Sequence, residues 1–284
     1  HPRRFAIEVV RSDDGREAVF PVPGPGRYFS VHFAGPDNRT PESGWIRHML
    51  CVFVDPRETD VPQPGDEGTV WYAPSVDPQR LRTAEILCFD PGYHPLRDYG
   101  RGGLIDDDGR LTLQAGQALY LAGGAFVEGI VETASRQATD QRVFGRGILS
   151  GRAYRWHRHP DHSGTVYRQI LRLGSRGRVE GITILDSPHH GIVGWTTRIV
   201  NVKLVGWHCN NDAVRVGSGS EISHSFFRAV DDHFYNFDIH VHDVVLWAGH
   251  NGAVLTYGWG GEAGSRTYRS GGSLLENIDI IHPE

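Results

Sequence analysis

Long apolar runs and cysteine motifs are both missing from this sequence. No uncharged apolar stretch approaches the roughly 20 residues needed to span a bilayer, and the N-terminal HPRRFAIEVV has no signal-peptide core. Three cysteines, Cys51, Cys88 and Cys209, permit at most one disulfide and include no CxxC spacing. We therefore expect neither a membrane segment nor a cysteine-based zinc or redox site, and the cysteines leave the redox compartment open.

An excess of basic charge is also missing. The formal net charge is −5 and the pI is about 6.3, which argues against nucleic acid or an anionic membrane as a partner. Methionine and lysine are scarce, whereas glycine is abundant at 36 residues. Many tight turns between short strands use that much glycine, so the composition favours an all-β protein with a neutral or locally acidic groove.

Short apolar segments recur along the C-terminal two thirds of the chain. One series contains segments 181–184, 201–204, 221–226, 243–246 and 277–280, of which the first four follow at steps of roughly 20 residues. A second series lies between them and contains segments 191–195, 213–216, 234–237 and 253–257. Two interleaved strand series at one period indicate a coil with several strands per turn, which is typical of a parallel β-helix.

Residues 1 to about 85 have a different texture. Their short β-branched or aromatic segments are bounded by Pro/Gly clusters such as 21–26, which predicts a small N-terminal β-sandwich ending between Ser75 and Thr83. We assign residues 86–284 to the coil. Its last strand lies directly before Glu284, and an uncovered rung would leave an unpaired sheet edge. We therefore expect either a longer natural chain or a partner segment that caps the coil.

Polar residues recur in phase with the coil, ahead of each segment in the second series. They occupy positions 189–190, 211–212, 231–233 and 250–251. Adjacent rungs are about 4.8 Å apart, so residues at equivalent places form a ladder on one outer face. This phase predicts that Asp212, Asp231 and Asp232 lie close together and that one of them stays protonated near neutral pH. The alternative is that they are turn aspartates with local hydrogen bonds.

Several motifs, taken in order, resemble glycoside hydrolase family 49, the dextranases and isopullulanase. They are AGGAFVEG at 122–129, GRGILSG at 145–151, EGITI at 180–184 with SPHH at 187–190, the aspartates at 212 and 231–232, and YGW at 257–259. The resemblance covers roughly residues 85–284. The polygalacturonase family is more distantly similar, through NND at 210–212 and the aspartate pair at 231–232.

This resemblance implies a right-handed parallel β-helix preceded by a small β-sandwich, and hydrolysis with inversion. Asp231 would be the general acid, while Asp212 and Asp232 would hold and deprotonate the attacking water. An inverting site separates its carboxyl groups by about 6.5–9.5 Å to admit that water. The sequence departs from the family after the aspartate pair, where His233 replaces a glycine or cysteine. His233 would change the subsite around the scissile bond, which bears on whether dextran is the substrate.

Aromatic and polar side chains near the ladder are candidates for substrate contacts. Sugar rings present apolar faces to aromatic platforms, although large aromatic residues also fill cores. The candidates are His190, Trp195, Trp207, Asn211, His233, Tyr235, His250, Tyr257 and Trp259. Arg215 is the lone basic residue near the predicted groove and does not form the cluster that a polygalacturonate substrate needs. The pattern therefore favours a neutral α-glycan.

Other functions stay open. A polygalacturonase-like pectin hydrolase and a uronate epimerase or lyase would need basic groups, and a glycan-binding β-helix has no use for three adjacent carboxylates. A nitrogen/oxygen metal site is a further alternative, formed by Asp232 with His208, His224, His233, His240 and His242. We predict a secreted, inverting glycosidase whose leader has been removed. It acts on a polysaccharide or oligosaccharide without a metal or other cofactor, and without a nucleic-acid or membrane partner.

Overall fold

The computed structural model describes residues 7–22, 24–32, 38, 48–100, 104–135, 137–156, 169–257 and 271–281. The chain divides into two compact units, His1–Arg57 and Glu58–Glu284. No helix within the described ranges is long and apolar enough to cross a membrane. The three cysteines are all described residues and form no disulfide.

The first unit contains two antiparallel strand pairs. Strand β1 (Val10–Arg11) pairs with β2 (Ala18–Val19), and β3 (Arg27–His32) pairs with β4 (Met49–Val54). These pairs are what the structure describes of the sandwich expected for residues 1 to about 85. The compact unit ends at Arg57, and β5 (Thr69–Trp71) already pairs in parallel within the second unit. The coil therefore includes residues ahead of position 86, where we expected it to begin.

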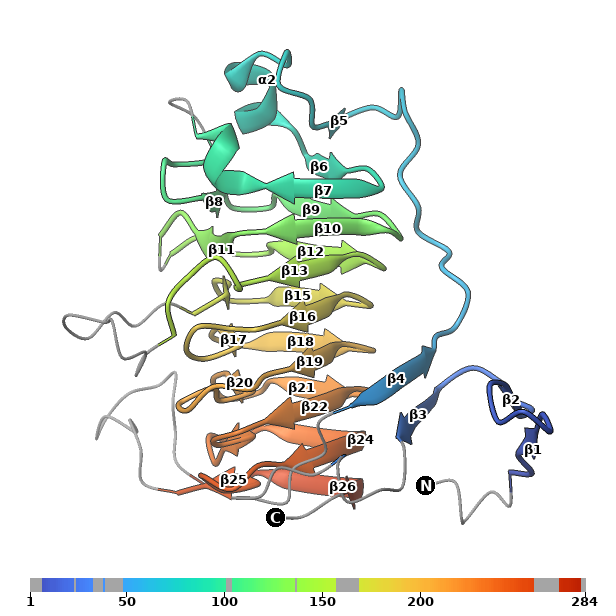
Figure 1. Ribbon diagram of the computed structural model, residues 1–284. Coiled ribbons are helices and arrows are strands. Elements are labelled where there is room, and N and C mark those ends of the chain that lie inside the picture. Colours follow the sequence, from blue (N-terminus) through green and yellow to red (C-terminus); the bar gives the residue numbers. More distant parts are fainter. Residues whose placement is uncertain are drawn as a thin grey trace. The chain divides into compact units, whose positions relative to one another are not determined.

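The second unit is a parallel β-helix, which confirms the predicted fold class (Figure 1). Each full turn carries three strands. The first strand series contains β5, β6 (Ile86–Phe89), β9 (Ala118–Leu121), β12 (Arg142–Gly145), β15 (Gly177–Glu180), β18 (Thr197–Val200) and β21 (Glu221–Ser223). The second contains β7 (Gly92–Pro95), β10 (Ala125–Glu128), β13 (Ile148–Ser150), β16 (Thr183–Leu185), β19 (Lys203–Val205) and β22 (Phe226–Ala229).

Two long strands continue both of these series. They are β24 (His240–Ala248) and β26 (Leu274–Ile281), and they join the two series into one 15-stranded parallel sheet. The third series contains β8 (Arg110–Leu113), β11 (Ile130–Thr133), β14 (Leu171–Arg172), β17 (Ile192–Val193) and β20 (Val214–Arg215), followed by β23 (Phe234–Tyr235) and β25 (Leu255–Thr256). Helix α2 (Pro78–Thr83) and the 3₁₀ helix η2 (Leu96–Tyr99) belong to the first turns.

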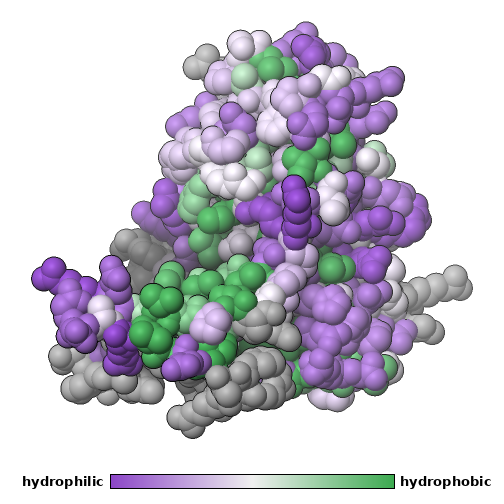
Figure 2. Space-filling model, turned by 90° about the vertical axis from the view of Figure 1, so that its right-hand side faces the viewer, coloured by the Kyte–Doolittle hydropathy of each residue, from purple (hydrophilic) through white to green (hydrophobic). Residues whose placement is uncertain are grey.

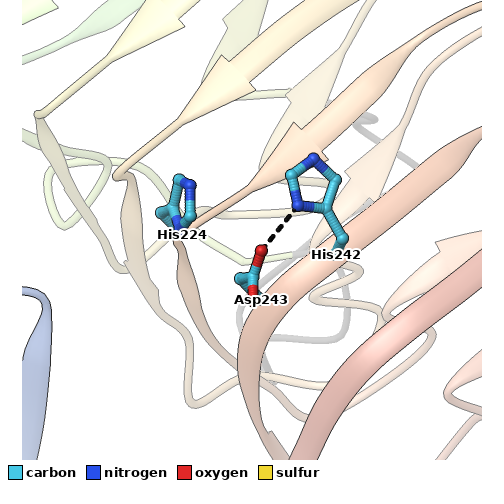
Figure 3. Close-up of side chains that lie close together, drawn as sticks. All are labelled: His224, His242 and Asp243. Atoms are coloured by element: carbon cyan, nitrogen blue, oxygen red, sulfur yellow. Dashed lines mark hydrogen bonds and ion pairs between the residues drawn. The ribbon is translucent and has the colours of Figure 1, made fainter.

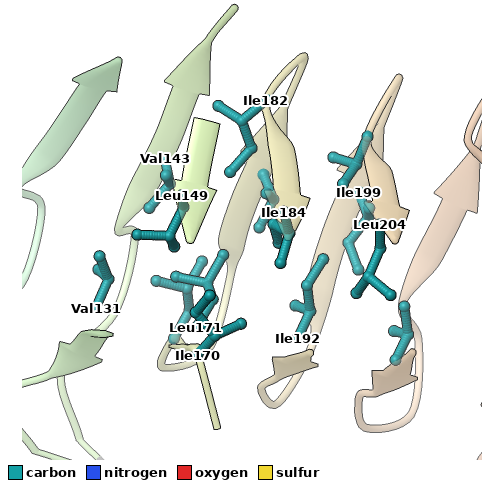
Figure 4. Close-up of a cluster of buried hydrophobic side chains, with 14 of the residues drawn as sticks. Val131, Val143, Leu149, Ile170, Leu171, Ile182, Ile184, Ile192, Ile199 and Leu204 are labelled. Atoms are coloured by element: carbon teal, nitrogen blue, oxygen red, sulfur yellow. The ribbon is translucent and has the colours of Figure 1, made fainter. Parts of the chain in front are cut away.

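Stacked apolar side chains fill the coil, one ladder from each strand series (Figure 4). The first ladder is Leu87, Leu119, Val143, Val179, Ile199, Ile222 and Val241; the second is Val127, Leu149, Ile184, Leu204, Phe227 and Leu246; the third is Leu111, Val131, Leu171, Ile192 and Val214. Each of these side chains is buried. Because the strands alternate inward and outward positions, the ladders fix the register of every rung.

Left-handed backbone residues form the corner between the first and second series. The corner positions are Gly181, Asn201, His224, Asp243 and Asn277, with φ between 49° and 80°. Glycine, asparagine, aspartate and histidine are the residues that adopt this conformation most readily. The side chains at these corners therefore stack from rung to rung in the same way as the strands.

One face of the molecule is shown in Figure 2, where hydrophilic residues predominate and hydrophobic residues form smaller patches. This distribution agrees with a coil whose apolar side chains point inward.

Candidate active site

The three aspartates lie at the entry to two consecutive strands of the third series. Asp212 precedes β20, and Asp231-Asp232 precede β23. The Ala213 amide donates to the Asp232 carbonyl at 2.9 Å, and the Gly191 amide donates to the Asp212 carbonyl at 2.8 Å. This register places His190, Asp212 and Asp232 at equivalent positions of successive rungs. The structure thus brings the acidic residues together on neighbouring turns.

Asp212 is the most enclosed of the three acids. Its side chain is 5% exposed, it accepts a hydrogen bond from the Tyr235 hydroxyl at Oδ2, and His190 Nε2 lies 3.5 Å from the same oxygen. Burial raises the pKa of Asp212 to about 7; the Tyr235 hydrogen bond opposes this, and the charges of Asp231 and Asp232 add to it. Asp212 therefore binds a proton close to neutral pH.

Asp231 and Asp232 are half-buried and are held by the next rung. Asn251 Nδ2 donates to Asp231 Oδ2 at 2.6 Å, and the Ala253 amide donates to Asp232 Oδ1 at 2.8 Å. Gly252, between these two donors, has φ +93°, and a Cβ there would lie 2.5 Å from Asp231 Oδ1. Glycine is needed for this close approach. We did not predict Asn251, although the phase of the polar ladder pointed to the segment 250–251.

Rings stack behind Asp212 and hold its partners in place. The rings of His189 and His190 are 4.0 Å apart and nearly parallel, and His190 is 6.3 Å from the Tyr235 ring. The Arg215 guanidinium lies over the ring of Tyr235, the second partner of Asp212, at 5.3 Å from the ring centre. This cation also lowers the pKa of Asp212, though less than burial raises it. Tyr235 and His190 thus position an acid. Both side chains are themselves buried, at 5% and 8% exposure, and the substrate contacts expected of them stay predictions.

Four of the predicted substrate contacts have side chains that are at least partly accessible. Trp207 is 36% exposed, Tyr257 is 68% exposed, His250 is exposed and Trp195 is half-buried. The Arg228 guanidinium covers one face of Trp207 at 3.5 Å from the ring centre. Trp259 lies outside the described residues.

Asn211 and His233 lie inside the coil. Asn211 is fully buried and donates through Nδ2 to the carbonyls of Ser187 and His189. His233 is 1% exposed, its Nε2 is 3.2 Å from the Trp247 carbonyl, and burial lowers its pKa to about 4. Neither side chain reaches the surface, so the substrate contacts predicted for them, and the altered subsite at His233, are not supported.

The metal site that the sequence left open as an alternative does not form as one group among the described residues. His233 is interior, Asp232 belongs to the acid group, and the ring of His208 stacks on Trp156 at 5.2 Å. His224 and His242 do lie together, but their third neighbour is Asp243.

The three acids and their partners can perform general acid–base chemistry. Such catalysis works best when the pKa of the group lies near the operating pH, which burial achieves for Asp212. The pair at 231–232 supplies two further carboxyl groups on the adjacent rung.

Comparison with known proteins gives a consistent set of relatives, although no family model matches the chain. The chain is 27% identical over 248 residues to a dextranase from Arthrobacter globiformis, covering 75% of this chain and 37% of that protein. It is 26% identical over 291 residues to an isopullulanase from Aspergillus niger, covering 90% of this chain and 48% of that protein.

Solved structures show the same fold. Dex49A from Penicillium minioluteum superposes with a TM-score of 0.70 at 20% identity, over 99% of this chain and 53% of that one. A polygalacturonase from Erwinia carotovora gives a TM-score of 0.50 at 11% identity, over 79% of this chain and 70% of that one. The predicted resemblance to glycoside hydrolase family 49 is confirmed. The chain spans about half or less of the length of these curated relatives.

Proposed function

We propose that this homologue of dextranases and isopullulanase is a glycoside hydrolase that cleaves α-glycosidic bonds in a neutral α-glucan with inversion of configuration. The observation that supports it most is the position of Asp212, whose pKa is raised to about 7, on the rung next to Asp231 and Asp232. A glycan-binding surface does not need adjacent carboxylates, which repel one another, whereas glycoside hydrolysis uses a pair of carboxyl groups.

In this proposal Asp231 is the general acid and gives its proton to the glycosidic oxygen as the bond to the anomeric carbon breaks. Water attacks that carbon from the opposite face and passes a proton to Asp212 or Asp232. Tyr235 and His190 hold the Asp212 carboxyl, and Asn251 and the Ala253 amide hold the pair. These contacts keep the acids in place while the sugar ring changes shape.

The basic residues near the acids favour a neutral sugar over a uronate. Arg215 lies over the ring of Tyr235, and Arg228 lies over the ring of Trp207 while donating to the Gly206 carbonyl. Both guanidinium groups are thus engaged with the protein. The names of the relatives, dextranase and isopullulanase, agree with an α-glucan as substrate.

Product stereochemistry tests the proposal directly. The chain is incubated with dextran, pullulan and polygalacturonate, and the anomers released are followed by NMR before they mutarotate. We expect one of the two glucans to be cleaved with inversion. Retention would refute the mechanism, release from polygalacturonate alone would refute the substrate, and glycan binding without any product would identify a binding protein.

Substitution of the acids tests their roles. Asp231→Asn and Asp212→Asn should each lower kcat by about 10²–10⁴-fold, the range that a general acid or base contributes. Asp140→Asn is the matched control, because Asp140 is an exposed aspartate that pairs with Arg176 instead. Far-UV circular dichroism checks that all three variants fold. Wild-type turnover in either acid variant would remove that residue from the site.

The pH dependence of kcat/KM distinguishes the two possible roles of Asp212. As a base, Asp212 must be ionised, so the rate should rise as pH increases through about 7, the pKa of its carboxyl. A rate that instead falls through pH 7 would make Asp212 the proton donor and exchange its role with Asp231.

Export of the protein belongs to the same proposal, because an extracellular polymeric glucan can be degraded only by an enzyme outside the cell. Activity in the culture medium of the source organism tests it.

A further inference from the structure

Two histidines and one aspartate, residue types that can bind metal ions, lie together at the corner between the first and second strand series. The three acids of the candidate active site instead precede strands of the third series. His224 follows β21, while His242 and Asp243 lie in β24 (Figure 3). One ligand atom from each residue falls within 4.8 Å of the other two. This spacing follows from the fold, because neighbouring rungs are about 4.8 Å apart.

The backbone fixes where these side chains point. His224 and Asp243 occupy equivalent left-handed corner positions, with φ of 49° and 54°. The His224 amide donates to the His242 carbonyl at 3.3 Å, which joins the two rungs at this corner. In Figure 3 the three side chains surround a common space, with the His242 ring turned toward Asp243.

His242 and Asp243, the two residues of the cluster that lie in β24, are each held in place by a further residue. His242 Nδ1 is 2.8 Å from Asp243 Oδ2, and Glu221 Oε1 is 3.5 Å from the other ring nitrogen, Nε2. Asn277 Nδ2 donates to Asp243 Oδ1, which leaves Oδ2 directed at His242. A carboxylate behind a ligating histidine and a hydrogen bond to a ligating carboxylate are the usual supports of a metal site.

We propose that His224, His242 and Asp243 bind one divalent transition-metal ion, with zinc as the ion that suits them best. Two imidazole nitrogens and one carboxylate oxygen are ligands that zinc accepts, and water completes its tetrahedral shell. Zinc bonds of about 2.0–2.1 Å require ligand atoms about 3.4 Å apart. The ligand atoms lie within 4.8 Å, and the His224 ring is exposed, so a rotation of that ring closes the site.

The ion would clamp the rung that carries the acid pair. The rung that begins at β21 continues through β22 to Asp231-Asp232, and β24 begins the rung that reaches Asn251. A metal bridge from His224 to His242 and Asp243 ties these two rungs together. The ion would therefore stabilise the coil, and it takes no part in the acid–base chemistry proposed above.

Calorimetric titration tests the site with zinc chloride as the probe. Tag-free protein is treated with EDTA, dialysed and titrated, and we expect one ion per chain. Binding should also raise the midpoint of thermal unfolding by roughly 5 °C when free zinc is about 100 times Kd. Cobalt chloride gives an independent readout, because a cobalt ion held by imidazole and carboxylate ligands shows visible absorption bands that the aquo ion lacks.

Two variants remove ligands and keep the backbone conformation. His224→Asn and Asp243→Asn place asparagine at left-handed positions that it tolerates, and each should weaken zinc binding about 100-fold. His240→Gln is the matched control, because His240 lies two residues before His242 in β24 and pairs with Glu276 at 2.9 Å. Circular dichroism in EDTA checks the fold of each variant.

The zinc and cobalt measurements on the wild type and the three variants distinguish a real metal site from its absence. Loss of zinc binding and of the cobalt bands in both ligand variants, with the control unchanged, supports the site. Wild-type protein that binds no zinc, a His224→Asn variant that binds as tightly as the wild type, or equal loss in His240→Gln would overturn the assignment.

Discussion

Burial controls the protonation of Asp212, the most enclosed acid of the candidate site. The carboxyl is 5% exposed, and loss of water penalises its charged form more than the Tyr235 hydroxyl and Arg215 favour it. Asp231 and Asp232 add like charge from the adjacent rung. The three groups form one coupled set, so a titration of this site reports the set and not a single residue.

Stability should depend on pH because of Asp212. Its pKa is raised from an ordinary 3.8 to about 7, so the folded protein binds the proton more tightly than the unfolded chain does. The stabilisation is complete below about pH 4 and is lost as pH rises through about 7. Asp212→Asn should remove this decline and make the protein more stable than the wild type above pH 7, by roughly 2–4 kcal/mol. Urea unfolding between pH 4 and 8 measures it.

Tyr235→Phe provides the matched control for that experiment. The variant keeps the Asp212 carboxyl but removes the hydroxyl that donates to it. The decline with pH should persist and extend to higher pH, because the lost hydrogen bond had lowered the pKa of Asp212. Parallel stability curves for the wild type and Asp212→Asn would contradict the raised pKa.

At the scale of the strand, some strands of the coil can be predicted from the sequence more easily than others. Four strands of the third series, β17, β20, β23 and β25, fall within segments that the sequence predicted. Strands β15 and β18 of the first series were missed. They read GRVE and TRIV, with Arg178 and Arg198 pointing to solvent, so their apolar signal rests on alternate residues alone. Only their pairing reveals them as strands.

Interior positions of the second series should be costly to truncate. Phe227 is fully buried and stacks between Leu204 and Leu246 on the neighbouring rungs. Phe227→Ala should lower the free energy of unfolding by about 3–5 kcal/mol, because the rungs cannot collapse into the space left behind. Ile280→Ala is the control, since Ile280 stands in the same ladder but is 49% exposed, and it should cost far less. Equal losses in denaturant titrations would contradict the ladder.

At the scale of the whole molecule, the apolar core belongs to one unit. The main cluster of buried hydrophobic residues, from Leu81 to Leu246, lies entirely within Glu58–Glu284. We predict that a chain beginning at Glu58 folds cooperatively, because it keeps every ladder of the coil. A single unfolding transition with a β-rich circular dichroism spectrum checks this, and the full-length chain is the control. An aggregated or unfolded product would show that residues 1–57 are needed for folding. The capping segment expected beyond the last rung stays a prediction.

The class of fold, the family resemblance and the spacing of the three aspartates could all be predicted from the amino-acid sequence. These features follow from sequence patterns. Apolar and polar residues alternate within a strand, apolar segments recur at steps of roughly 20 residues, and turn residues separate them. The coil converts that recurrence into adjacency, since residues one period apart become neighbours about 4.8 Å apart. This is why the grouping of Asp212 with Asp231 and Asp232 follows from their spacing in the sequence.

The folded coil, and not the sequence pattern, shows which side chains point inward and which partners each acid has. Asn211 and His233 belong to the same polar segments as the acids, yet the register buries them, and it brings Asn251 to Asp231. It also groups His242 with Asp243 and His224, whereas the metal site considered as an alternative from the sequence did not include Asp243. Burial and hydrogen bonding depend on which residues of successive rungs align. A one-residue shift in that alignment would reverse inside and outside.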